Sequence, residues 1–70
     1  MTPADRARAA KAFLANPLAR ALFEAIREDR MREIVASDLT ASALREQCYL
    51  AIRALDEMRG QLEVWAREAG

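Results

Sequence analysis

The chain has 70 residues, 53% of them apolar and 31% charged, and its 11 basic and 11 acidic side chains give no net charge. A chain of this length forms one domain, placed at residues 1–70, and buries only about 60% of the surface that its unfolded form exposes, so self-association would add stability. No apolar run approaches the roughly 18 residues of a membrane-spanning helix, and scattered charges interrupt the N-terminal region where a signal peptide would be apolar. We therefore expect a cytoplasmic protein that does not enter a membrane.

The first predicted helix covers residues 3–15. Thr2 is placed as its N-cap, Pro3 at its first position and Asp5 near the positive end of the helix dipole. The candidate contacts to nucleic acid are its basic side chains, Arg6, Arg8 and Lys11. Because about three phosphate contacts release few counterions and the whole chain is neutral, we expect the isolated protein to bind DNA weakly at most.

The second predicted helix covers residues 17–36, with Asn16 as its N-cap and Pro17 at its first position. Its second half is mostly charged, and Arg27 and Arg30 share a side of the helix with Ile34. Two interpretations are open. The arginine stems cover the apolar stripe and their guanidinium groups pair with acids of a facing helix, or the three side chains form a contact face for an acidic partner or a phosphate.

The third predicted helix covers residues 40–69, with Asp38 or Thr40 as its N-cap. Apolar or small side chains recur along it at alternating spacings of three and four, which is typical of a coiled-coil seam. The seam consists of Ala41, Leu44, Cys48, Ala51, Leu55, Met58, Leu62, Trp65 and Ala69. Tyr49, Leu50 and Ile52 lie beside the seam, so we expect the first helix or a second subunit to cover the helix there.

These elements predict an all-α fold in which the second and third helices form a long, antiparallel, coiled-coil-like hairpin and the short first helix folds across one end. A seam of this length needs another helix to cover it. The sequence therefore predicts a homo-oligomer that assembles through the third helix.

The residue types predict no enzyme, cofactor or metal site. The chain has no histidine, which removes the imidazole base, the common nucleophile pairs and the usual nitrogen ligand of metals. Carboxylate pairs at helical spacing, such as Glu24 with Glu28, lack the histidine that accompanies them in di-metal bundles. The single cysteine, Cys48, lies in the seam, where we expect it to act as a small buried apolar residue.

Most of the chain, from Ala10 to Leu62, resembles small helical proteins of tailed bacteriophages that are encoded among DNA-packaging and head-assembly genes. The similar segments are KAFLANPLARALFEAI (11–26) and LREQCYLAIRALDEMRGQL (44–62). The matching residues are Leu14, Asn16, Pro17, Leu18, Phe23, Arg45, Glu46, Ala51, Leu55, Asp56 and Arg59. The resemblance implies a phage, prophage or gene-transfer-particle setting. The hairpin is also similar to the oligomerisation core of small terminase subunits, although this chain has no recognisable N-terminal DNA-binding domain.

The leading hypothesis is a non-enzymatic assembly or DNA-packaging factor of the small-terminase kind, which acts through helix-mediated oligomerisation and contacts with a packaging or head protein. On this hypothesis the protein is cytoplasmic or associated with a virion, and it contacts DNA weakly or through the assembled oligomer. Two alternatives remain. One is a small nucleic-acid-associated regulator that uses the basic first helix, and the other is an inhibitor directed at a host protein.

Overall fold

The computed structural model describes residues 1–38 and 40–68 of the chain. Three helices account for most of them: α1 (Pro3–Ala15), α2 (Pro17–Ala36) and α3 (Ser42–Arg67), and the described residues contain no strand. The predicted all-α class is therefore confirmed. The predicted end of the third helix at residue 69, and with it Ala69 of the seam, lies outside the described residues.

The first two helices begin where the local sequence predicts. The Thr2 side-chain oxygen accepts a hydrogen bond from the backbone N–H of Asp5 at 3.1 Å. The Asn16 side-chain oxygen accepts from the N–H groups of Leu18 at 2.8 Å and Ala19 at 3.3 Å. Both caps satisfy backbone donors that have no partner inside the helix, so the two predicted N-caps are confirmed.

The predicted start of the third helix is wrong by two residues. α3 begins at Ser42, and its N-cap is Ala41, which offers no side-chain acceptor. The Asp38 side chain instead accepts a hydrogen bond from the backbone N–H of Thr40 at 3.4 Å, within the connection. Short polar side chains that bond to nearby backbone in this way compete with helix formation, and here neither predicted residue caps α3.

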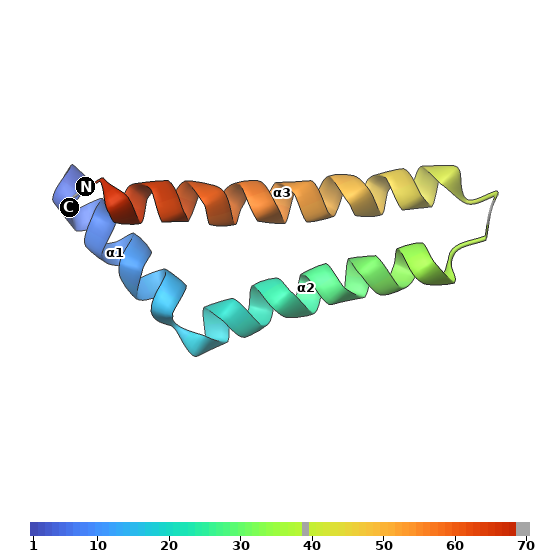
Figure 1. The fold of residues 1–70 in the computed structure, drawn as a ribbon, viewed down its shortest axis with the longest axis horizontal. Helices are drawn as coiled ribbons and strands as arrows, with labels where there is room; N and C mark the ends of the chain where they lie inside the picture. The colour runs from blue at the N-terminus through green and yellow to red at the C-terminus, as the bar shows by residue number, and fades with distance from the viewer. Residues whose placement is uncertain (39, 69–70) are drawn as a thin grey trace.

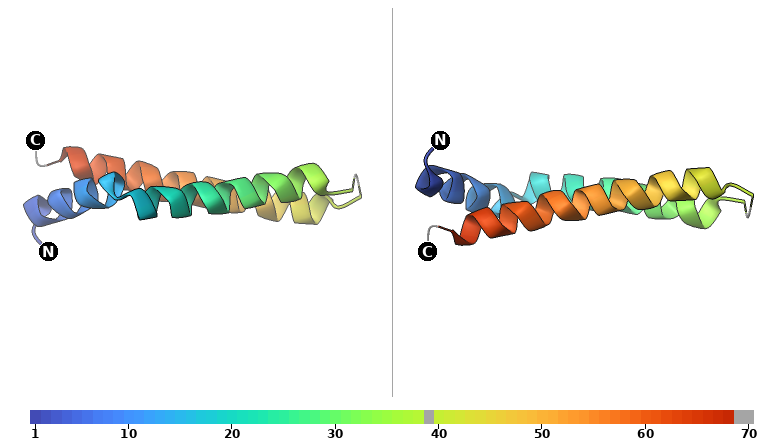
Figure 2. Two further views of the ribbon diagram at one scale, coloured as in Figure 1. Left: turned by 90° about the horizontal axis from the view of Figure 1, so that it is seen from below. Right: turned by 90° about the horizontal axis from the view of Figure 1, so that it is seen from above.

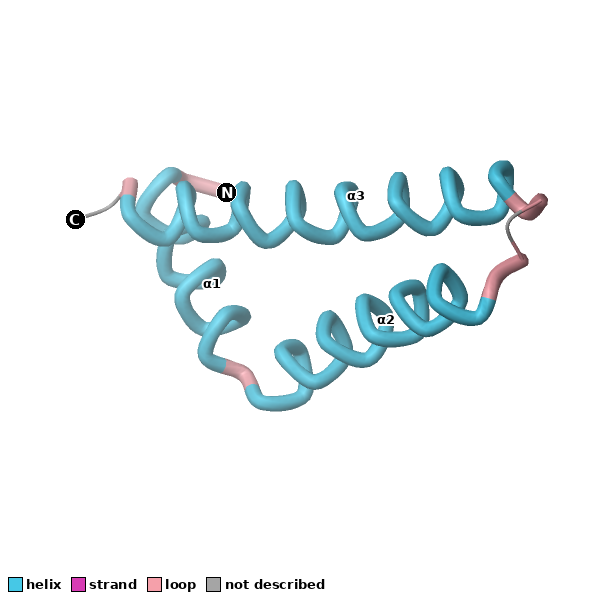
Figure 3. The backbone as a smooth tube through the Cα atoms, turned by 45° about the vertical axis from the view of Figure 1, so that its right-hand side comes forward, coloured by secondary structure: helices cyan, strands magenta, loops and turns pink. Residues whose placement is uncertain are grey.

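Both α1 and α2 pack against α3, which forms the longest element of the molecule (Figure 1). Figure 1 shows α1 beside the C-terminal half of α3 and α2 beside its N-terminal half, with the corner between α1 and α2 turned away from α3. The tube in Figure 3 shows the same triangular outline from another side. All three helices follow the long axis when the molecule is seen from above or below (Figure 2), and its extents are 48 × 20 × 16 Å.

The buried core is thin. The buried apolar residues among those described are Ala7, Ala10, Ala19, Cys48 and Ile52. Most of them are small, so the helices approach each other closely but remove little apolar surface from water. Large apolar side chains therefore remain at the surface, and several of them lie on α3.

Candidate protein interface on the long helix

The predicted seam of α3 is divided between the interior and the surface. Cys48 is buried, and Ala51, Leu55, Leu62 and Trp65 are half-buried. Leu44 and Met58 are 43% and 56% exposed. Ile52, which we expected beside the seam, is only 7% exposed. α3 thus packs against its own chain through residues that include Ile52, beside the predicted seam, while Leu44 and Met58 of the seam face outward.

The outward part continues as a line of uncharged residues along α3. Its seven members recur at alternating spacings of three and four, so they share one side of the helix. We call this line the α3 stripe, and it consists of Leu44, Gln47, Ala51, Ala54, Met58, Gln61 and Trp65. Sequence reasoning missed Gln47 and Gln61 because it scored apolar side chains alone, and it missed Ala54 because the predicted seam passed through its neighbour Leu55. The missing signal was the lack of charge at every position of the line.

Two hollows lie along the stripe, between α3 and the helices packed on it. The one near the C-terminal half of α3 has a volume of about 350 Å³, and almost all of its lining is apolar. It is lined by Phe13, Phe23, Met58, Gln61, Leu62 and Trp65. The rings of Phe13 and Phe23 meet edge to face with centroids 6.0 Å apart, which fixes the corner between α1 and α2 beside this hollow.

The second hollow, near the N-terminal half of α3, has a volume of about 410 Å³ and a more polar lining. It is lined by Arg30, Glu33, Leu44, Gln47, Cys48 and Ala51. Together the two hollows include six of the seven stripe residues. Stripe residues therefore line a hollow toward each end of α3, and Ala54, between the two, lines neither.

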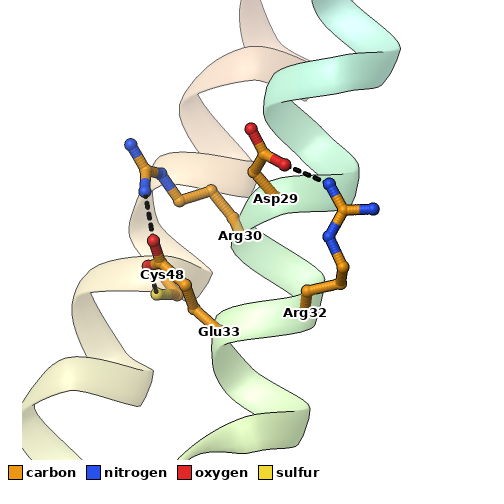
Figure 4. Close-up of polar contacts among 5 residues, drawn as sticks. All are labelled: Asp29, Arg30, Arg32, Glu33 and Cys48. Atoms are coloured by element: carbon orange, nitrogen blue, oxygen red, sulfur yellow. Dashed lines mark hydrogen bonds and ion pairs between the residues drawn. The ribbon is translucent and has the colours of Figure 1, made fainter.

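A polar contact joins α2 to α3 at the second hollow (Figure 4). The Cys48 thiol donates a hydrogen bond to Glu33 Oε2 at 3.1 Å, and Arg30 Nη1 donates to Glu33 Oε1 at 2.9 Å. The hydrogen bond with Glu33, together with burial, raises the pKa of the Cys48 thiol. Because the thiolate is the reactive form of cysteine, this environment favours an inert, structural Cys48.

The candidate partner face on α2 is partly engaged within the chain. Arg27 Nε lies 3.4 Å from Asp56 Oδ1 on α3, and Arg30 pairs with Glu33 on its own helix. Ile34 is half-buried. This geometry favours the interpretation that arginine stems cover the apolar stripe of α2 while their heads pair with acids, as Arg27 does across the two helices.

The candidate nucleic-acid contacts on α1 are not equally available. Arg6 Nη2 lies 2.5 Å from Glu68 Oε2, and its guanidinium carbon lies 4.9 Å from the centroid of the Trp65 ring. Arg8 forms an ion pair with Asp5. The pKa of the Asp5 carboxyl is lowered mainly by its hydrogen bond with Thr2 and, to a smaller degree, by Arg8. Lys11 is exposed. Arg6 thus ties α1 to the end of α3, and its charge is opposed by Glu68.

Other classes of site have no structural counterpart in the described part of the chain. No three histidine, cysteine or acidic side chains gather there in a way that could hold a metal ion. None of the described helices is long and apolar enough to cross a membrane.

The sequence matches no known protein family, and no curated protein or solved structure is significantly similar to it.

Proposed function

We propose that this chain is a non-enzymatic assembly or DNA-packaging factor of phage type, which acts through helix-mediated oligomerisation and protein contacts. On this proposal α2 and α3 form an antiparallel, coiled-coil-like hairpin whose long helix is the assembly surface. The exposed apolar side of α3 is the observation that carries the proposal. Leu44 and Met58 belong to the stripe, while Leu50 and Val64 lie next to it, and all four are at least 40% exposed. Large apolar side chains exposed along one helix are typical of interaction sites in soluble proteins.

The phage setting is supported by the resemblance of residues 10–62 to small helical proteins encoded among packaging and head genes. The α2–α3 hairpin is the part similar to the oligomerisation core of small terminase subunits. A packaging or head protein encoded nearby is accordingly the partner that we propose for the assembled chain. Contact with DNA then occurs weakly or through the oligomer, where several copies of Lys11 would act together.

Charge pairing on α1 argues against the alternative of a DNA-binding regulator. Glu68 and Asp5 oppose the charges of Arg6 and Arg8, and the whole chain is neutral. Few cations remain to replace the counterions of a phosphate backbone. An inhibitor of a host protein would use the same kind of apolar surface as an assembly factor, so only the identity of the partner separates these two functions.

The proposal is tested first by the mass of the purified protein in light scattering at micromolar concentration. We expect an oligomer, and a sharp mass near 7.8 kDa over a wide concentration range would overturn the proposed oligomerisation. The second step measures binding to purified packaging and head proteins encoded by the neighbouring genes. Binding to at least one of them is expected, and binding to none of them would overturn the proposed setting.

DNA binding by the same preparation separates the regulator from the assembly factor. Sequence-selective binding at submicromolar concentration in physiological salt, lost when Arg8 and Lys11 are both changed to glutamate, would favour the regulator. Weak binding that depends only shallowly on salt and does not depend on sequence is expected for the assembly factor, because few phosphate contacts release few counterions.

A further inference from the structure

The contact of α1 with α3 is built from small, deeply buried side chains and an ion pair. Ala7 and Ala10 are 1% and 3% exposed, and α1 lies beside the C-terminal half of α3 (Figure 1). Near the start of α1, Arg6 reaches both Glu68 and the Trp65 ring. These polar contacts involve α1 and the end of α3 alone, so they depend on no residue of α2. The α1 of a second copy carries the same groups and therefore fits the same surface.

A single residue attaches α1 to α2. α1 ends at Ala15 and α2 begins at Pro17, and Asn16 between them has an extended backbone. The Asn16 side chain caps α2, while the Asn16 N–H donates a hydrogen bond back to the Phe13 carbonyl oxygen at 3.2 Å. These bonds lie on opposite sides of the bond between Asn16 N and Cα, so rotation about that bond turns α1 and keeps all of them. The contact of the Phe13 and Phe23 rings is the interaction between α1 and α2 that such a rotation gives up.

The corner at Asn16 leaves an apolar hollow when α1 and α2 pack on the same α3. The corner stands away from α3 in Figure 1 and Figure 3. The hollow of about 350 Å³ beside it is lined by Phe13 and Phe23 of the corner and by Met58 and Leu62 of α3. If the two helices that cover one α3 come from different chains, no link joins them there. The walls of the hollow can then close and remove apolar surface from water.

From these observations we propose that two copies of this chain exchange α1, so that α1 of each copy docks on the C-terminal half of α3 of the other. Exchange of an identical element is a low-cost route to a dimer, because it reuses the contacts of the closed chain. Each copy then supplies Ala7, Ala10 and Arg6 to its partner. The proposal rests on the oligomerisation put forward above and assigns it to the exchange of one helix.

Reversing the charges of Arg6 and Glu68 in separate variants tests the exchange. In Arg6→Glu alone, or in Glu68→Arg alone, like charges face each other whichever copy supplies α1, so each variant should form fewer dimers than the original protein. An exchanged dimer with one copy of each variant restores an attractive pair at both contacts. The two variants are unfolded together in urea, refolded and examined by native mass spectrometry. The mixed dimer should be at least about threefold more abundant than the two same-variant dimers together, which it would equal in random pairing.

The matched control reverses an ion pair that lies within one helix. Arg59 and Glu63 face each other at 4.0 Å on α3, so exchange of α1 cannot restore their attraction between copies. A mixture of Arg59→Glu with Glu63→Arg should therefore pair at random. The proposal is overturned if the Arg6→Glu and Glu68→Arg mixture pairs at random or stays monomeric, or if both mixtures show the same excess of mixed dimer.

A longer connection between α1 and α2 provides a second measurement that changes no charge. A Gly-Ser-Gly-Ser segment inserted between Ala15 and Asn16 keeps the Asn16 cap and lets both helices of one chain pack on the same α3 without the sharp corner. Dimerisation should weaken at least tenfold while helix content stays unchanged. Dimerisation as strong as in the original protein would contradict the exchange.

These experiments separate the exchange of α1 from the proposed function. If the original protein forms a dimer but the Arg6→Glu and Glu68→Arg mixture pairs at random, the exchange is overturned and the proposed function is left intact. An excess of the mixed dimer, without any packaging or head partner being found, would support the exchange and count against the proposed function.

Discussion

The two halves of α3 are covered in different ways. Against the C-terminal half, α1 places Ala7 and Ala10, which are 1% and 3% exposed, so the helices meet with almost no side chain between them. Against the N-terminal half, α2 meets α3 through larger groups, with Ile52 buried and Cys48 bonded to Glu33. The contact of α1 with α3 depends on a close fit of small side chains. The contact of α2 with α3 depends on buried apolar volume and on a hydrogen bond. Substitutions should therefore weaken the two ends for different reasons.

The largest effect is expected at Ile52, the bulkiest of the buried residues described. Ile52→Ala removes a buried side chain and leaves a cavity, which should lower the free energy of unfolding by about 3 kcal/mol. Val35→Ala is the control, because Val35 is 82% exposed and its loss should change stability by less than about 0.5 kcal/mol. Urea denaturation followed by circular dichroism measures both. An equal loss of unfolding free energy in Ile52→Ala and Val35→Ala would show that α2 does not pack on α3 as described.

The close fit of α1 is tested by adding volume. Ala10→Leu should destabilise the protein by about 2 kcal/mol, because the new side chain has no space between α1 and α3. Ala12→Leu places the same side chain on the exposed side of α1, where helix propensity changes little. Thermal melting compares the two variants. A stable Ala10→Leu protein with unchanged Trp65 fluorescence would contradict the close contact.

A smaller effect is expected from the tie between α1 and the end of α3. Arg6→Gln removes the ion pair with Glu68 and the contact with the Trp65 ring. Both groups are partly exposed, so the loss should stay below about 1 kcal/mol. The emission of Trp65 should nevertheless change, because its ring loses the covering guanidinium. Arg8→Gln, which breaks only the local pair with Asp5, should leave that emission unchanged.

The smallest expected effect on stability occurs only at alkaline pH and involves the contact of Cys48 on α3 with Glu33 on α2. Because the pKa of Cys48 is raised in the folded protein, the folded state holds this proton more tightly than the unfolded state. Its contribution to stability is complete below the ordinary thiol pKa of 9.0 and is lost as the pH rises through the folded value. The ultraviolet absorbance of the thiolate measures this titration. Glu33→Gln should move the midpoint back toward lower pH, and an unmoved midpoint would mean that Glu33 does not control the thiol.

Local chemistry made part of this fold predictable. Thr2 and Asn16 were identified as caps because capping depends on a few neighbouring residues, and the same holds for the all-α class. Ala41 was not identified as a cap because its side chain gives no signal. The exposed position of Met58 was also missed, and Ile52, which was expected beside the seam under the first helix or a second subunit, is buried within its own chain. On a helix of 3.6 residues per turn two adjacent lines fit the heptad pattern almost equally well, and the choice between them is made by α1 and α2, which pack from distant parts of the sequence.

The tie between Arg6 and Glu68 has a consequence for the order of folding. The two residues are 62 positions apart, so the contact of α1 with the end of α3 cannot form until nearly the whole chain has been synthesised. The contacts of α2 with α3, such as Cys48 with Glu33 at a separation of 15, close a much shorter loop and lose less chain entropy when they form. α2 and α3 should accordingly pair first, and α1 should dock last. A chain released before Glu68 is added would keep the contact of Phe13 with Phe23, but its N-terminal helix could not form the ion pair that joins it to the end of α3.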